Sequence, residues 1–383
     1  MTSQVVFLSI GIAAAAAAAD LTVGTPAQLM AVLKQAQPGD VIVMADGVWR
    51  DVDIVFVARG TAERPITLRA QTPGKVIVTG GSRLRMGGEH LVVDGLWFRD
   101  GSLTAGSVIE FRADSKKLAT HCRLTNCAVT GYNPRNRKTD YKWCSVYGWS
   151  NRVDHCYFAG KTHVGATLVV WVGDRPNWHR IDRNHFGPRP PLGTNGGETI
   201  RVGDSRTSMN SSRTVVEENL FERCDGEIEI VSNKSCDNVY RGNTFWECAG
   251  TLTLRHGNRC LVLENVFIGN GKKNTGGIRI LGEDHRIVGN RFYELAGTGL
   301  RAALCLMNGI PDSPLNGYFQ VKRAVVASNT LARCAQDIVI GFREGKATLA
   351  PVDCVITDNC VLTCDLKPVT LPVVGPGWRA VWR

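Results

Sequence analysis

Short apolar runs recur along the chain, and the same small phrase follows each of them. The runs are three or four residues long and rich in β-branched residues or leucine, and an asparagine follows, with phenylalanine or another apolar residue two positions later. Clear copies of the phrase lie at 218–221, 242–245, 264–267 and 289–292, and weaker copies lie at 125–127, 155–158, 183–186, 328–330 and 358–360. The asparagines of the clear copies are 24, 22 and 25 residues apart, at Asn219, Asn243, Asn265 and Asn290. This spacing indicates a structural repeat of about 24 residues.

A repeat of this length, with short strands and no helical periodicity, predicts a solenoid. Leucine-rich repeats have a similar period, but their LxxLxL frame is absent. We therefore expect an all-β, single-domain parallel β-helix of roughly a dozen coils, in which inward asparagines stack at one turn. Longer connections are expected at 128–150, at 187–198 within the 35-residue gap between Asn184 and Asn219, and at 297–320.

Both ends of a solenoid need a cap, because an open coil exposes its core and a strand edge. Residues 25–36 have the pattern of an N-capped amphipathic helix, so we expect a short capping helix at the N-terminal end. Residues 367–383 contain proline and tryptophan, and we expect them to pack over the other end.

Residues 1–19 are interpreted as a signal peptide. The apolar run at 5–19 is shorter than the roughly 20 residues of a membrane span, and its alanines offer cleavage positions. Residues 1–4 carry no Lys or Arg, so the usual positive start is missing and a buried N-terminal helix is the alternative. With a signal peptide, residues 20–383 form the mature chain, which we expect to be periplasmic or secreted, with no span in the membrane.

The net charge of the chain narrows the classes of partner that it is expected to bind. The 383 residues carry 45 Lys and Arg against 35 Asp and Glu, a formal net charge of +10, and 44% are hydrophobic. This composition excludes disorder and favours a polyanionic partner: nucleic acid, anionic lipid or acidic polysaccharide. The basic residues are dispersed and no nucleic-acid-reading motif is present, so no nucleic acid partner is expected. We expect a monomer.

The 13 cysteines follow the repeat. Cys224 and Cys248 are 24 residues apart, and so are Cys236 and Cys260, whereas no CxxC pair occurs. This spacing argues against zinc and predicts equivalent positions in successive coils. Stacked free thiols are the first interpretation, and disulfides between coils remain the alternative.

Aligning the coils places charged residues on one outward face. Apolar and polar residues alternate at 199–202, 227–230, 251–255 and 277–280, so these stretches are expected to stack as neighbouring strands. Their outward residues are Arg201, Glu227, Glu229, Arg255 and Arg279. Alternate positions on one strand face are about 6 to 7 Å apart, close enough for both glutamates to reach one hard cation such as calcium. Salt bridges between these glutamates and the neighbouring arginines are the structural alternative.

The same stretches resemble polysaccharide lyase family 6, which contains alginate lyases and chondroitinase B. The resemblance rests on 195–203, 227–229, 232–235 and 254–258, with further similarity at 39–42, 47–49 and 276–280. It implies a right-handed parallel β-helix and a calcium ion held by Asn195, Glu227 and Glu229. It also implies Lys234 as catalytic base and Arg255 as catalytic acid, with substrate contacts from Arg201, His256 and Arg279. From the sequence alone, Lys234 could equally be a solvent-facing turn residue, and His256 a hydrogen-bonded one.

The resemblance implies a calcium-dependent lyase that cleaves alginate, an anionic polysaccharide, by β-elimination. A lyase of this kind removes the C5 proton of a uronate and expels the 4-linked sugar, which leaves an unsaturated uronate end. A dermatan sulfate or chondroitin lyase of the same family is the first alternative, and a non-catalytic polysaccharide-binding β-helix is the second. A pectinase-type hydrolase would need closely placed aspartates as acid and base, whereas this face offers Glu, Lys and Arg.

Overall fold

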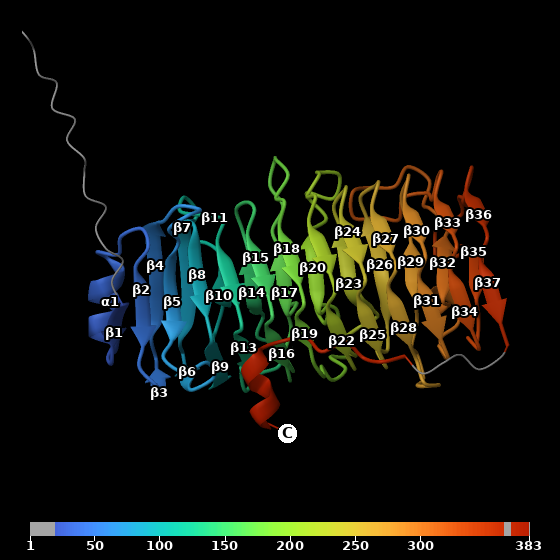
Figure 1. Ribbon diagram of the computed structural model, residues 1–383. Helices are drawn as coiled ribbons and strands as arrows, with labels where there is room; N and C mark the ends of the chain where they lie inside the picture. The colour runs from blue at the N-terminus through green and yellow to red at the C-terminus, as the bar shows by residue number, and fades with distance from the viewer. Residues whose placement is uncertain (1–19, 364–368, 383) are drawn as a thin grey trace, which may run out of the picture.

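Three long parallel sheets wind around one elongated core in the computed structural model, which describes residues 20–363 and 369–382 (Figure 1). Sheet A contains β1 (Asp20–Val23), β2 (Val41–Met44), β5 (Ile66–Ala70), β8 (Leu91–Asp94), β12 (Arg123–Thr125), β15 (Arg152–Asp154), β18 (Arg180–Asp182), β21 (Val215–Glu217), β24 (Val239–Arg241), β27 (Leu261–Leu263), β30 (Arg286–Val288), β33 (Val325–Ala327) and β36 (Val355–Thr357). Sheet B contains β3 (Gly47–Arg50), β6 (Val76–Gly80), β9 (Leu96–Gly101), β13 (Ala128–Thr130), β16 (Tyr157–Ala159), β19 (His185–Phe186), β22 (Leu220–Glu222), β25 (Thr244–Trp246), β28 (Val266–Ile268), β31 (Arg291–Tyr293), β34 (Thr330–Ala332) and β37 (Cys360–Leu362). Sheet C contains β4 (Asp53–Arg59), β7 (Arg83–Glu89), β10 (Ser107–Glu110), β11 (Ala119–Thr120), β14 (Lys142–Val146), β17 (Leu168–Val170), β20 (Ile200–Gly203), β23 (Glu229–Lys234), β26 (Thr251–His256), β29 (Ile278–Ile280), β32 (Leu304–Met307) and β35 (Ile338–Phe342).

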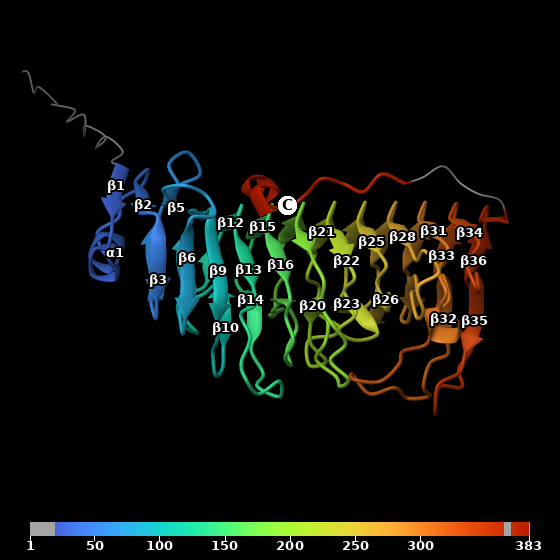
Figure 2. The ribbon, with the colours of Figure 1, turned by 90° about the horizontal axis from the view of Figure 1, so that it is seen from below.

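Each coil contributes one strand to each sheet in turn, which confirms the predicted parallel β-helix (Figure 2). The apolar residue of the repeated phrase points inward, and its phenylalanines form one stacked column: Phe158, Phe186, Phe221, Phe245, Phe267 and Phe292. Within the described residues, no helix has the length and apolar character needed to cross a membrane.

The asparagine stack lies at the turn from sheet A to sheet B. From Asn219 onward, each side-chain oxygen accepts from the backbone N–H and the side-chain amide of the asparagine one coil earlier, as Asn243 does from Asn219 at 3.1 and 3.0 Å. Asn184, the first member, accepts from the Cys156 N–H at 2.9 Å. The ladder runs through Asn184, Asn219, Asn243, Asn265, Asn290, Asn329 and Asn359. Asn126 is not part of it, because Asn126 occupies the positive-φ position before the ladder and Cys127 follows in its place. The weaker phrase at 125–127 therefore has the predicted turn but not the predicted stacked amide.

A second ladder lies at the turn from sheet C to sheet A. Here a buried side chain accepts from the backbone N–H of the coil before: Asn151 from Cys122 at 2.8 Å, Asn238 from Thr214 at 2.9 Å, and His285 through Nδ1 from Cys260 at 3.1 Å. His285 Nε2 donates to the Leu281 carbonyl at 2.8 Å. Burial lowers the pKa of His285 to about 4, because the charged imidazolium would lose its hydration. A proton on Nδ1 would in addition displace the Cys260 N–H.

Replacing His285 with asparagine is expected to weaken the pH dependence of stability. Because the unfolded chain binds a proton at His285 below about 6.5 and the folded chain does not until about 4, stability is lost as the pH falls through this interval. His285→Asn keeps an acceptor for the Cys260 N–H, as Asn238 does for Thr214, and removes the titration. Between pH 7 and 5 the variant should lose about 2 kcal/mol less stability than the parent, measured by urea unfolding. An equal loss in both proteins would contradict this account.

The two ends of the solenoid differ from each other. Helix α1 (Pro26–Leu33) begins at its N-cap Thr25, buries Leu29 and Leu33, and confirms the predicted cap. The prediction that residues 367–383 cover the other end is wrong. Residues 369–382 run back along the outside of the solenoid and end in the 3₁₀ helix η2 (Gly377–Trp382) beside β13 and β16 (Figures 1 and 2). Trp378 donates to the Asn126 carbonyl at 2.7 Å, because the Asn126 turn exposes that carbonyl there.

The structure corrects several expectations about the loops and the cysteines. The stretches 128–150 and 297–320 are not continuous loops, because they contain β13, β14, the 3₁₀ helix η1 (Gly299–Arg301) and β32. Cys248 lies on Cys224 as predicted, with its sulfur 3.4 Å from the Cys224 N–H, but Asn238 rather than Cys236 pairs with Cys260. The twelve cysteines of the described residues are free thiols. Residues 1–19, interpreted as a signal peptide, lie outside the described residues.

Candidate functional site

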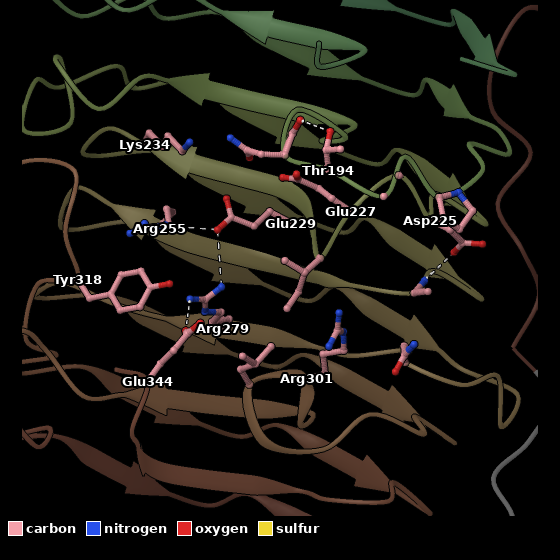
Figure 3. Close-up of a pocket in the computed structure, with 18 of the residues that line it drawn as sticks. Thr194, Asp225, Glu227, Glu229, Lys234, Arg255, Arg279, Arg301, Tyr318 and Glu344 are labelled. Atoms are coloured by element: carbon pink, nitrogen blue, oxygen red, sulfur yellow. Dashed lines mark hydrogen bonds and ion pairs between the residues drawn. The ribbon is translucent and has the colours of Figure 1, made fainter. Parts of the chain in front are cut away.

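An open cleft of about 720 Å³ lies on sheet C, in the middle of the solenoid (Figure 3). Its floor comes from the outer face of β23, β26 and β29, and one wall comes from the turns that lead from sheet B into sheet C. The other wall comes from the long connection after β32 and the turn after β35. The lining residues that carry charge are Asp225, Glu227, Glu229, Lys234, Arg255, Arg279, Arg301 and Glu344. The structure therefore brings together Asn195, Glu227, Glu229, Lys234, Arg255 and Arg279 of the predicted site.

Two bulges in the sheet aim the central side chains into this cleft. Glu229 pairs with Thr251 and Val231 with Leu252, so Ile230 is an extra residue that allows both Glu229 and Ser232 to face outward. Asn233 pairs with Leu254 and Lys234 with His256, so Arg255 is the extra residue of β26. Bulges re-aim side chains in this way at many functional sites.

The bulges also correct the predicted alignment of the coils. Strict alternation placed Glu229 in register with Arg201 and the neighbouring strands. In the structure, Ser232 has that position, between Arg201 on β20 and Thr253 on β26, and Thr253 pairs with Arg279 on β29. The predicted strands are neighbours, but their register differs because each bulge adds one residue.

The two glutamates have different surroundings. Glu227 lies in the turn before β23, and its Oε2 accepts from the backbone N–H groups of Gly196 and Gly197 at 3.1 and 3.3 Å. Burial, reinforced by the charges of Glu198 and Glu229, raises the pKa of Glu227 to about 8. Glu229 accepts a 2.5 Å hydrogen bond from the Ser232 hydroxyl.

Two arginines face Glu229 from the next coils. Its Oε1 lies 3.4 Å from Arg255 Nε and 3.7 Å from Arg279 Nη1. These contacts match the salt bridges that the sequence left open as an alternative, so Glu229 has cationic neighbours as well as a place in the cleft. Burial lowers the pKa of the Arg255 guanidinium, and the nearby charge of Arg279 adds to this effect.

The far wall holds these arginines in place. The Tyr318 ring lies under Arg255, with 4.2 Å from the guanidinium carbon to the ring centre, and Arg255 Nη1 donates to the Gly317 carbonyl at 3.0 Å. Glu344 Oε2 lies 3.4 Å from Arg279 Nη2. Tyr318, Glu344 and Ser232 were not predicted. The first two lie in connections without a strand pattern, and the third became outward-facing only through the bulge.

Lys234 lies at the end of β23, on the same side of Glu229 as Arg255 (Figure 3). Among the described residues, no hydrogen bond or ion pair of its ammonium group is found, whereas Arg255 and Arg279 in the same cleft are paired with carboxylates. A partly buried, unpaired lysine is free to meet a substrate atom.

The structure does not place two predicted substrate contacts in the lining of the cleft. His256 is 1% exposed, and burial together with the charges of Arg255 and Lys234 lowers its pKa to about 3. Arg201 lies one strand away, over the Trp171 ring at 5.3 Å. His256 is the neighbour of a lining residue, since it pairs with Lys234, whereas Arg201 pairs with Ser232, which is buried and outside the lining.

The donor set of Asn195, Glu227 and Glu229 fits a hard cation. Two carboxylates and one amide supply oxygen atoms only, which calcium prefers and zinc does not. The described residues hold no cluster of three His, Cys, Asp or Glu side chains suited to a metal, so the Asn195 amide is needed to complete the set. Burial raises the pKa of Glu227, and a cation bound beside it would oppose this effect.

Comparison with known proteins agrees with this geometry. The family model for chondroitinase B matches residues 23–352. A structure of the PL6 family alginate lyase AlyGC is 46% identical with a TM-score of 0.86, over 88% of this chain and 47% of that one. A mannuronic acid specific polysaccharide family 6 lyase from human gut microbiota is 33% identical with a TM-score of 0.82, over 89% of this chain and 82% of that one. A PL6 family polysaccharide lyase from Pseudopedobacter saltans is 27% identical with a TM-score of 0.83, over 94% of this chain and all of the other.

No curated protein matches the chain. The chain spans about half the length of the AlyGC structure, at 47%. The family match nevertheless covers every coil that builds the cleft, from β20 to β35. The chain belongs to polysaccharide lyase family 6, the family of alginate lyases and chondroitinase B.

Proposed function

We propose that this protein is a calcium-dependent polysaccharide lyase that cleaves alginate by β-elimination. The observation that carries the proposal is the meeting, in one cleft, of an unpaired lysine, two arginines and a pair of glutamates. This set matches the needs of a uronate lyase, which must bind a carboxylate, remove the adjacent proton and stabilise the resulting negative charge.

Each residue has a distinct part in this proposal. Lys234 takes the C5 proton of the uronate through its side-chain nitrogen. Asn195, Glu227 and Glu229 would hold calcium, which would neutralise the substrate carboxylate and so make the C5 proton more acidic. Arg255 stabilises the developing charge beside the leaving 4-oxygen. Because a guanidinium is a poor acid even with its pKa lowered by burial, we assign proton delivery to water.

Arg279 is proposed to bind a uronate carboxylate at the floor of the cleft. It is 3% exposed, and Glu229 and Glu344 lie nearby, so its guanidinium group is held in one orientation. Arg201 and His256 remain proposed substrate contacts at the edge of the cleft. Arg201 would require a substrate that extends beyond the lining residues, and His256, which is 1% exposed, would require the side chains that cover it to move.

The choice of alginate rests on the similar structures. AlyGC is an alginate lyase, and the gut enzyme is mannuronic acid specific. The family model is that of chondroitinase B, so dermatan sulfate is the second candidate substrate. Since such polymers lie outside the cell, we also propose export of the protein.

Ultraviolet absorbance of the unsaturated uronate tests this proposal. The protein is mixed with alginate, and separately with dermatan sulfate, in calcium-containing buffer and again after removal of calcium by a chelator. We expect absorbance to rise on alginate with calcium, to stop after chelation and to return when calcium is restored. A rise on dermatan sulfate alone would reassign the substrate. Folded protein that acts on neither polymer is not a lyase of these substrates.

A further inference from the structure

A buried arginine with no assigned role lies directly behind the cleft. Arg189 follows β19 and is 3% exposed, yet no carboxylate forms an ion pair with it among the described residues. Its guanidinium donates to one hydroxyl and four backbone carbonyls, those of Thr167, His163, Gly165, Gly196 and Glu198, at 3.2, 3.1, 3.0, 3.2 and 2.5 Å. Burying a charged group that is bonded only to backbone and hydroxyl groups costs free energy of folding. This cost is consistent with a role of these bonds in positioning the backbone segments that accept them.

The acceptors belong to two connections from sheet B to sheet C. Residues 163–167 lie in the coil before the cleft, and residues 196–198 follow Asn195 directly. Arg189 donates hydrogen bonds to this second connection on both sides of Gly197, to the carbonyls of Gly196 and Glu198. A planar guanidinium is suited to such a task, because its donors point in fixed directions.

The opposite side of the same connection faces Glu227. The N–H groups of Gly196 and Gly197 donate to Glu227 Oε2, so this short segment is bonded to Arg189 through its carbonyls and to Glu227 through its N–H groups. Gly226 lies against both Gly197 and Arg189: a Cβ atom at position 226 would lie 2.2 Å from the Gly197 carbonyl oxygen and 2.8 Å from Arg189 Nε. Only glycine fits between them.

We propose that Arg189 is a positioning residue that fixes the 195–198 segment, and with it Asn195, beside Glu227 and Glu229. This inference rests on the proposed function for its consequence, calcium binding, but not for its structural content. Arg189 is not among the residues that line the cleft. It acts by fixing the peptide groups that follow Asn195 and that orient Glu227.

The test compares Arg189→Met with a matched control, Arg152→Met. Arg152 is bonded to Asp182 at 2.8 and 2.6 Å on sheet A, away from the cleft, so its loss also removes an arginine from the solenoid wall. Calorimetric titration with calcium chloride measures affinity, and hydrogen–deuterium exchange in calcium-free buffer measures protection of the amides of Gly196 and Gly197. Circular dichroism establishes that each variant is folded.

Arg189→Met should bind calcium at least about tenfold more weakly, as is usual when a residue supporting a metal ligand is lost. Exchange at Gly196 and Gly197 should be at least tenfold faster, and excess calcium should restore much of kcat. Arg152→Met should match the parent in all three. Parental calcium affinity and exchange in folded Arg189→Met would overturn the inference.

A second variant covers failure to fold. Arg189→Lys keeps the charge but cannot reach both connections, so faster exchange in folded Arg189→Lys also supports the inference, and parental exchange overturns it. If both variants are unfolded while Arg152→Met is folded, Arg189 holds the whole coil and the inference is wrong. If the parent itself binds no calcium, the proposed function fails, while the exchange result still decides the role of Arg189.

Discussion

Replacing Lys234 with alanine is expected to lower kcat on alginate by about 10³-fold while the solenoid stays folded. Lys234 lies in the cleft with no bonded partner among the described residues, so its loss removes no structural contact. A side chain that takes a proton in the rate-determining step typically contributes 10² to 10⁴-fold, which gives this magnitude. Calcium affinity should stay within about twofold of the parent, because Lys234 is not among the proposed ligands.

Lys322→Ala serves as the matched control. Lys322 lies outside the cleft and is paired with Glu283 at 3.3 Å, so its loss should leave kcat unchanged. Rates are measured from the ultraviolet absorbance of the product, and folding from circular dichroism. Full activity in folded Lys234→Ala would exclude Lys234 as the base.

Glu229→Gln is expected to lower both calcium affinity and kcat/KM, each by about 10²-fold or more. The carboxylate is the common neighbour of Arg255, Arg279 and Ser232, and it is also a proposed ligand of the ion. The amide keeps the shape of the side chain but loses the charge, so the cleft gains net positive charge and repels the ion. Arg255, which is partly buried, and Arg279, which is buried, also lose the anion that they share.

Glu283→Gln is the control for this change. Glu283 is paired with Lys322 and Arg323 on the surface of the solenoid, outside the cleft, so its neutralisation should not alter calcium binding. Titration calorimetry and initial rates separate the two effects. Glu229→Gln that binds calcium like the parent would show that Glu229 only pairs with arginine, the alternative that the sequence left open.

The fold was largely predictable from the sequence because its signals are local and repeated. The asparagines from Asn184 to Asn359 each satisfy the backbone of the coil before, and this need recurs in every coil. The same logic failed at Asn126, which occupies the positive-φ position before the ladder, so that Cys127 takes the ladder position. The second ladder was not predicted, and its members differ in chemistry, as Asn238 and His285 do.

The site was predictable in part of its membership. The resemblance identified six residues that the structure gathers in one cleft and two, Arg201 and His256, that lie outside its lining, and alternation alone gave the wrong register. A bulge costs one residue and leaves no compositional sign, so neither Ile230 nor Arg255 could be recognised as extra residues. Tyr318 and Glu344 come from connections whose path depends on long-range contacts, such as the hydrogen bond from Arg255 to the Gly317 carbonyl.

The course of the C-terminal segment was unpredictable for the same reason. Its tryptophan and prolines suggested a cap, but nothing local determines which part of the solenoid receives them. Trp378 lies against Trp97 and donates to the Asn126 carbonyl, more than 200 residues earlier in the chain. The partners of a docking segment are set by the surface it meets rather than by its own pattern.

The central claim is that one cleft binds calcium and a uronate carboxylate beside Lys234. A crystal structure of Lys234→Ala with calcium and an alginate oligosaccharide tests it most directly, since this variant should bind substrate without cleaving it. The account predicts an ion held by Asn195, Glu227 and Glu229, a uronate carboxylate at that ion, and the C5 atom of the same sugar facing position 234. An oligosaccharide bound elsewhere on the solenoid, or in the cleft with no ion at these three residues, would contradict it.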